Sequence, residues 1–130
     1  MNPTHFRYSW TSYFGGTFEL KRTKLGVKYR FSHYPFELSY NDGWKEIEVS
    51  PAHWQQFKEE VLALSDWKPE YAEPEILDGE DWEVFIKYPE RSIRSKGYHA
   101  WPDDFEKFER ALEMIGVKRD SNLWETLALQ

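Results

Sequence analysis

Residues 97–116, GYHAWPDDFEKFERALEMIG, contain the point at which a strand pattern gives way to a helix pattern. The apolar residues that follow the two aspartates are spaced i, i+3, i+7 and i+10, which places them on one face of a helix: Phe105, Phe108, Leu112 and Ile115. Pro102 stands near the start of this segment, and Gly116 has the position of a helix-ending glycine. The stretch therefore predicts an amphipathic helix over about 102–115.

An earlier segment repeats this spacing. Trp54, Phe57, Val61 and Leu64 share one helical face, and Ser50 with Pro51 makes a favourable N-cap and first residue. The sequence therefore predicts a second amphipathic helix over about 50–65.

Most of the remaining chain alternates apolar and polar residues with a period of two, which is typical of half-buried antiparallel strands. The alternating segments are 17–21, 26–32, 45–49, 82–88 and 92–100. Phe36, Leu38 and Tyr40 continue the pattern, and Asn41-Asp42-Gly43 predicts a hairpin turn.

These elements predict one α+β domain over residues 1–130, with an antiparallel sheet and both helices packed on one of its faces. Strands followed by a helix occur twice, which is a weak internal repeat. The connection between the two halves is expected to be extended, pinned by Trp67, Tyr71 and Ile76. The tail predicts a short C-terminal helix that begins near Ser121.

Composition narrows the function classes. The chain has 130 residues and no cysteine, which excludes disulfides, thiolate nucleophiles and cysteine-ligated metal sites. Its formal net charge of −6 argues against general nucleic-acid binding. No segment is apolar enough for a secretory leader or a membrane span, so we expect a cytoplasmic protein.

No motif indicates a cofactor or a metal. The four histidines are His5, His33, His53 and His99, and no two of them have a metal-ligand spacing. Neither a phosphate-binding glycine loop nor a nucleophile motif is present. We therefore expect no cofactor, no metal and no catalytic residue.

Two segments are candidate binding surfaces. Residues 70–83 hold seven acids and no base, and six of these acids form what we call the acidic connector: Glu70, Glu73, Glu75, Asp78, Glu80 and Asp81. We call Tyr98, His99 and Trp101 the aromatic junction, because they lie where a strand meets a helix. The acids are a solvated loop, a docking surface for a basic partner or a calcium site, although their spacing differs from that of the usual calcium loop. The aromatic residues either close the core or line a pocket.

A third segment is basic. Residues 21–30 hold five lysines and arginines in ten positions, with Lys28 and Arg30 on the polar side of a predicted strand. Such a ribbon either binds anions or nucleic acid, or it is the solvated side of a sheet whose lysines prevent edge pairing.

A set of motifs resembles an uncharacterised bacterial family. Its members carry W-K-x-x-Y, L-D-G-x-x-W and G-x-N-x-Y-P-x-x-F, and this chain carries Trp67-Lys68…Tyr71, Leu77-Asp78-Gly79…Trp82 and Gly97…Pro102…Phe105. The resemblance covers about residues 44–116. His99 stands where the family has Asn, and Trp101 where it has Tyr. The resemblance implies a small stand-alone α+β domain and supplies no activity.

Three functions follow as hypotheses. The first is a non-catalytic domain that binds another protein through the acidic connector or the aromatic junction. The second is a small ligand-binding or enzymatic domain with a pocket at residues 97–102, in which His99 acts with a nearby acid. The third is an inhibitor of the immunity type or a phage-encoded protein, which rests on the acidity alone.

Overall fold

The computed structural model describes residues 2–12, 15–32, 43–77 and 79–117. Within them the elements are β1 (His5–Ser12), β2 (Gly16–Arg22), β3 (Gly26–Ser32), β4 (Lys45–Glu48), α1 (Pro51–Leu62), β5 (Glu70–Ala72), β6 (Glu80–Lys87), β7 (Ser92–Tyr98) and α2 (Phe105–Met114). The predicted strand residues 36–40, most of the hairpin turn, Asp78 and the predicted C-terminal helix lie outside the described residues.

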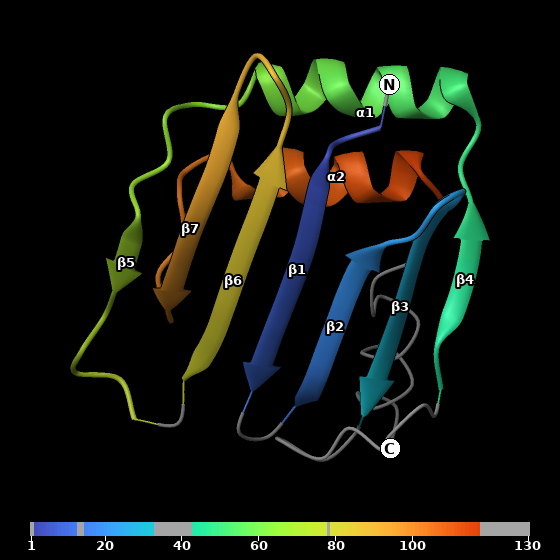
Figure 1. The fold of residues 1–130 in the computed structure, drawn as a ribbon. Helices are drawn as coiled ribbons and strands as arrows, with labels where there is room; N and C mark the ends of the chain where they lie inside the picture. The colour runs from blue at the N-terminus through green and yellow to red at the C-terminus, as the bar shows by residue number, and fades with distance from the viewer. Residues whose placement is uncertain (1, 13–14, 33–42, 78, 118–130) are drawn as a thin grey trace.

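The described strands form one sheet of seven in the order β4-β3-β2-β1-β6-β7-β5. Both helices lie side by side across one face of it (Figure 1). The predicted α+β class, the two helices and their shared face are therefore confirmed. We call the opposite face, which no described helix covers, the outer face.

The sheet is mixed, which corrects the prediction of a purely antiparallel sheet. All neighbouring strands pair antiparallel except β5, which pairs parallel to β7. The parallel pair arises because the chain, after leaving α1, enters β5 at the far edge of the sheet in the direction of β7. The segment predicted as an extended connection thus contributes an edge strand.

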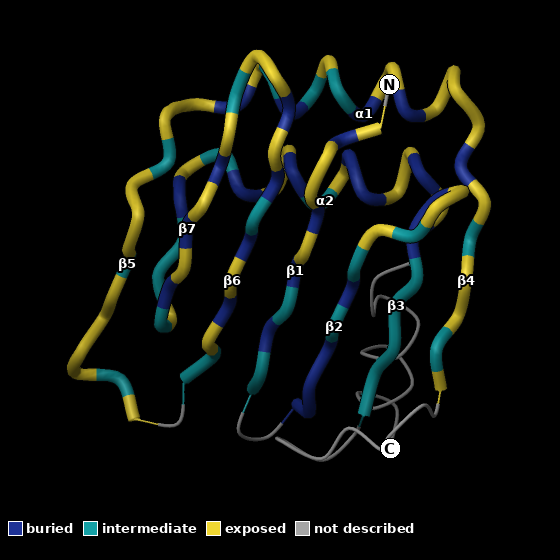
Figure 2. The backbone as a smooth tube through the Cα atoms, in the orientation of Figure 1, coloured by how far each residue is buried: buried dark blue, intermediate teal, exposed yellow. Residues whose placement is uncertain are grey.

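The alternation along the strands separates the core from the outer face. Figure 2 shows buried and exposed residues alternating along β6 and β7. The inner positions carry the large apolar side chains that pack against the helices: Phe6, Tyr8, Trp10, Phe18, Leu20, Trp82, Val84 and Ile86. The outer positions carry mainly charged and small polar side chains, with Phe85 and Tyr98 as aromatic exceptions, so the outer face is the more polar side of the sheet.

The helix ends agree with the sequence prediction to within a few residues. Ser50 caps α1, since its Oγ accepts a hydrogen bond from the His53 backbone N–H at 3.1 Å. Gly116 has φ 90°, and the backbone N–H groups of Gly116 and Val117 donate to Glu113 and Leu112 at 3.0 and 3.1 Å. This is a Schellman motif, which ends α2.

The start of α2 differs from the prediction. Residues 102–104 form a turn before the helix, and the Asp104 side chain makes no capping bond within α2. Its carboxylate instead accepts hydrogen bonds from the backbone N–H and the hydroxyl of Ser65, and from the Trp67 indole. Asp104 therefore joins the segment after α1 to the start of α2.

Candidate functional site

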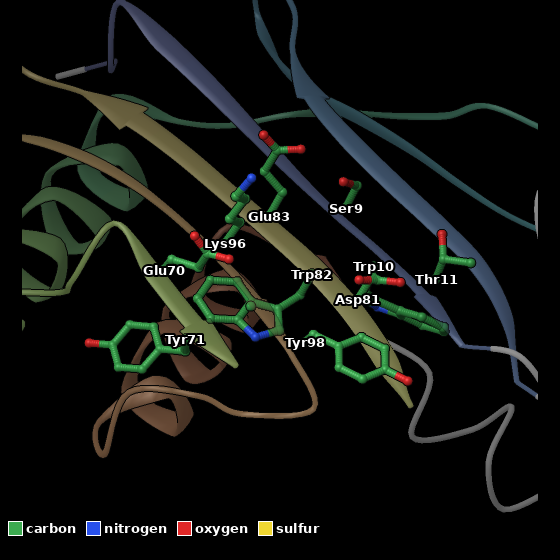
Figure 3. Close-up of a pocket in the computed structure, with 11 residues that line it drawn as sticks. Ser9, Trp10, Thr11, Glu70, Tyr71, Asp81, Trp82, Glu83, Lys96 and Tyr98 are labelled. Atoms are coloured by element: carbon green, nitrogen blue, oxygen red, sulfur yellow. The ribbon is translucent and has the colours of Figure 1, made fainter. Parts of the chain in front are cut away.

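A hollow of about 340 Å³ lies on the outer face, over β1, β6, β7 and β5. Its charged groups are the carboxylates of Glu70, Asp81 and Glu83 and the amine of Lys96, as Figure 3 shows. We call this site the outer hollow. Ser9 and Thr11 of β1 contribute short side chains beside these longer ones. Because the β1 side chains are shorter than those on β6 and β7, the surface is hollowed above them.

Strand register positions the charges. Lys96 of β7 is paired with Glu83 of β6 on one side and with Glu70 of β5 on the other. Asp81 lies two residues along β6, opposite Thr11. The carboxylates thus come from two strands that flank the amine.

These charges remain separated. The ion pairs within 4 Å that the structure gives for its described residues involve Arg30, Lys58, Arg91 and Arg110, and none involves Lys96. Three carboxylates and one amine in the same site leave an excess of negative charge in the outer hollow. Such a site is suited to a guanidinium or ammonium group, which carboxylates bind by charge-assisted hydrogen bonds.

A second hollow, of about 350 Å³, lies beside the start of α2. It is lined by Trp101 and Pro102, by Phe105, and by the carboxylates of Glu80, Asp103, Glu106 and Glu109. We call it the junction hollow. Across the described residues, no three acids or histidines are grouped closely enough to hold a metal ion.

The residues of the aromatic junction have different roles: Tyr98 holds a loop in place, and Trp101 lines the junction hollow. The Tyr98 hydroxyl donates a hydrogen bond to the Ile76 carbonyl at 2.6 Å and accepts one from the Gly79 N–H at 3.0 Å, so it holds the loop before β6. Trp101 is half-buried against the core and lines the junction hollow. Its ring centroid lies 5.3 Å from that of His99.

His99 lies at the edge of this region and does not line either hollow. Its φ of 48° is in the left-handed region, which histidine adopts more readily than most residues. Its backbone N–H donates to the Glu80 carbonyl at 2.7 Å. The described contacts therefore give His99 a part in the turn that leads from β7 to α2.

The structure distributes the acidic connector over three places. Glu70 and Asp81 line the outer hollow, and Glu80 lines the junction hollow. Glu73 and Glu75 are exposed in the turn after β5. Asp78 lies outside the described residues. The connector is thus not one continuous surface.

Sequence reasoning missed four polar side chains that line the outer hollow: Ser9, Thr11, Glu83 and Lys96. Glu83 belongs to the acidic segment 70–83, but the other three residues lie on strands outside that segment. No local pattern joins them, because only the register of β1, β6 and β7 brings them together.

Among the described residues, no helix has the length and apolar character needed to cross a membrane. No protein-family model matches the sequence, and a comparison with curated proteins finds no match.

Proposed function

We propose that this protein is a non-catalytic binding module that docks another protein on the outer face of its sheet. The outer hollow is the docking site, and the partner presents an arginine or lysine side chain to it. One observation carries the proposal: Glu70 and Glu83 flank Lys96 and Asp81 lines the same hollow, and none of these carboxylates forms an ion pair with Lys96 at 4 Å in the described residues.

Charge complementarity supports this choice of partner. Glu70, Asp81 and Glu83 stand at the rim of a concave site, where opposite charges steer association and fix the register of two proteins. An arginine fits best, because its planar guanidinium forms two parallel hydrogen bonds with one carboxylate. A partner's cation that approaches from the β5 side would first have to displace the Lys96 amine. A partner that cannot do so would be excluded.

The resemblance of the motifs to an uncharacterised bacterial family implies no activity, so the proposal rests on geometry. The cytoplasmic location expected from the sequence is part of the same proposal. The inhibitor hypothesis is a special case of it, in which the docked protein is inactivated.

A ligand pocket at residues 97–102 is the second candidate, and the junction hollow favours it. Trp101 offers an aromatic face next to Glu80 and Asp103. His99 does not line this hollow, so the candidate loses the proton-transfer role expected for that residue and keeps only ligand binding. Saturable quenching of Trp101 fluorescence by a small cationic ligand, absent in Trp101→Phe, would support it.

The experiment for the docking proposal is a quantitative pull-down from lysate with three forms of the protein. The first is wild type, and the second carries Glu70→Gln, Asp81→Asn and Glu83→Gln. The third is a control with the same change of charge on the helices, Glu59→Gln, Glu60→Gln and Glu113→Gln. A partner should be enriched by wild type and by the control and lost with the outer-hollow variant.

Retention of every partner by the folded outer-hollow variant would overturn the proposal. So would equal loss with both variants, because it would show an effect of total charge. An absence of any partner of wild type would also count against docking.

A further inference from the structure

A second feature of the outer face lies on β1, β2 and β3, beside the outer hollow and made of other residues. Arg7 of β1 is paired directly with Lys21 of β2, and Lys21 is paired directly with Lys28 of β3. We call these three residues the cation row. They point to the outer face because their neighbours Tyr8, Leu20 and Val27 point into the core.

This arrangement is unfavourable for the protein alone. Like charges directly opposite each other on neighbouring strands destabilise a sheet. Within the described part of the chain, none of the three cations forms an ion pair at 4 Å. Glu46 of β4 is paired with Lys28 at one end of the row, but it too forms none.

One aromatic ring partly offsets the repulsion. The Trp44 ring centroid lies 4.9 Å from the Lys21 amine, 4.8 Å from the Lys28 amine and 4.3 Å from the Arg30 guanidinium carbon. These cation–π contacts hold the cations near one another. Arg7 has no such contact with the Trp44 ring, so the ring does not offset the repulsion between Arg7 and Lys21.

The row continues across β6 and β7. Phe85 is paired with Arg7, and Arg94 is paired with Phe85, with its guanidinium carbon 4.4 Å from the Phe85 ring centroid. Strands lie about 4.8 Å apart, so the cation row spans about 10 Å and the extended row from Lys28 to Arg94 about 19 Å. Cations and half-buried aromatic rings thus follow one line across five strands.

We propose that the cation row binds the phosphate backbone of a single-stranded nucleic acid, with Trp44 and Phe85 as platforms for its bases. Surfaces of this class combine a line of cations with aromatic rings on which bases stack, and they show little sequence preference. This proposal is independent of protein docking in the outer hollow, because it uses other residues of the outer face.

Because the net charge is −6, binding depends on the local cation row, and its phosphate contacts make it sensitive to salt. Glu19 is the next outer-face residue after Lys21 on β2, and Glu83 is the next after Phe85 on β6. Glu19 forms an ion pair with Arg30 at 3.1 Å. A ligand that follows the cation row avoids both carboxylates. A ligand that follows the strands meets them.

The test measures fluorescence anisotropy of a labelled oligothymidylate of about twelve nucleotides, within the usual site size for such surfaces. Binding to the whole protein is followed from about 50 to about 200 mM salt. Three phosphate contacts predict that log K falls with log[salt] with a slope of about −2. The variant Arg7→Gln/Lys21→Gln should bind at least tenfold more weakly, with the slope reduced to about −0.7.

The matched control is Lys107→Gln/Arg110→Gln, which removes two exposed cations from α2. It should bind as wild type does, and both variants should give wild-type circular dichroism. A lack of binding by wild type at low salt would overturn the proposal. Equal weakening in the control would overturn it too, since it would show a response to total charge.

Two further probes separate this ligand from other polyanions. Polyglutamate and vesicles containing an anionic lipid should compete with the oligonucleotide more weakly than unlabelled oligonucleotide does. Tighter binding of either probe, lost in the Arg7→Gln/Lys21→Gln variant, would reassign the row to an acidic protein segment or to a membrane surface.

Discussion

Asp104 and Trp67 are joined by a hydrogen bond of 2.8 Å from the indole N–H to the carboxylate. The same carboxylate accepts the backbone N–H and hydroxyl of Ser65 at 2.7 and 2.9 Å. The Trp67 ring stacks on Phe105 of α2, with centroids 5.5 Å apart. One side chain thus fastens the chain that leaves α1 to the beginning of α2.

Replacing Asp104 by alanine should lower the free energy of unfolding by about 2 kcal/mol, because three hydrogen bonds to a charged acceptor are lost at a half-buried position. Chemical denaturation followed by tryptophan fluorescence measures the change. Asp103→Ala removes the neighbouring exposed acid and should change stability by less than about 0.5 kcal/mol. Equal effects of the two substitutions would contradict the structural role of Asp104.

The same carboxylate predicts a dependence of stability on pH. Partial burial raises the pKa of Asp104, but the hydrogen bonds from Ser65 and Trp67 outweigh burial and hold the pKa below its ordinary value. Because the pKa is lower in the folded than in the unfolded chain, the stabilisation is present above the ordinary value. It is lost as pH falls through the lowered pKa.

Glu90 contributes in the same direction, since the hydrogen bond from Lys58 lowers its pKa. Unfolding free energies measured from neutral to acid pH should therefore fall below about pH 5. The Asp104→Asn variant should show a shallower fall. An identical acid profile would exclude Asp104 as a source of this dependence.

Gly97 is required by the Trp82 side chain on the adjacent strand. A Cβ atom at residue 97 would lie 2.2 Å from Trp82 Nε1 and 2.5 Å from the Ala100 carbonyl oxygen, the two atoms joined by the 2.7 Å indole hydrogen bond. Gly97→Ala should therefore destabilise the protein by about 2 kcal/mol through overpacking.

A double-mutant cycle separates this clash from a general effect of the alanine. Trp82→Leu alone should cost about 3 kcal/mol, since a buried ring is replaced by a smaller side chain. Because it also makes room for the new methyl group, the double variant should be less destabilised than the sum by about 1 kcal/mol. Simple additivity would show that the two side chains do not collide.

Arg7→Gln should raise stability, in contrast to its expected effect on nucleic-acid binding. It removes a charge that lies directly opposite Lys21, so the gain should be about 0.5 kcal/mol at low salt and smaller at high salt, where screening is stronger. Thermal unfolding at two salt concentrations measures it. Lys107→Gln, on α2, should show no salt-dependent gain, and a loss of stability in Arg7→Gln would show that the row is not repulsive.

The helices were the most predictable part of the fold. The apolar spacing around Trp54 and Phe108, together with Ser50 and Gly116, marks both helices because each signal is local. The predicted start of α2 was less accurate, because Asp104 bonds to Ser65, which lies 39 residues away, and does not cap the helix. The spacing of residues within the helix does not predict that hydrogen bond.

The strands were predictable to different degrees. Alternation identifies β2, β3, β4, β6 and β7. The prediction did not include β1, although Phe6, Tyr8 and Trp10 alternate as clearly as residues in the other strands. β5 could not be predicted, because three residues carry no period and its parallel partner lies far along the chain.

The two surfaces depend on register, and register was not predictable. The five bases of residues 21–30 were visible in the sequence, but the alignment of Lys21 with Arg7 depends on how β1 pairs with β2. In the same way, the acidic run gave Glu70 and Asp81, while Lys96 and Ser9 joined them only through the pairing of four strands.

The strand order also divides the molecule by sequence. The chain through α1 forms β4-β3-β2-β1, and the chain after it forms β6-β7-β5, so the two blocks meet between β1 and β6 and between the helices. During synthesis on the ribosome, the first block presents β1 as an open edge until β6 emerges, which exposes it to chaperones and to aggregation. A backbone cut between residues 62 and 70 would make two fragments with one shared seam, which suits the protein to split-reporter complementation.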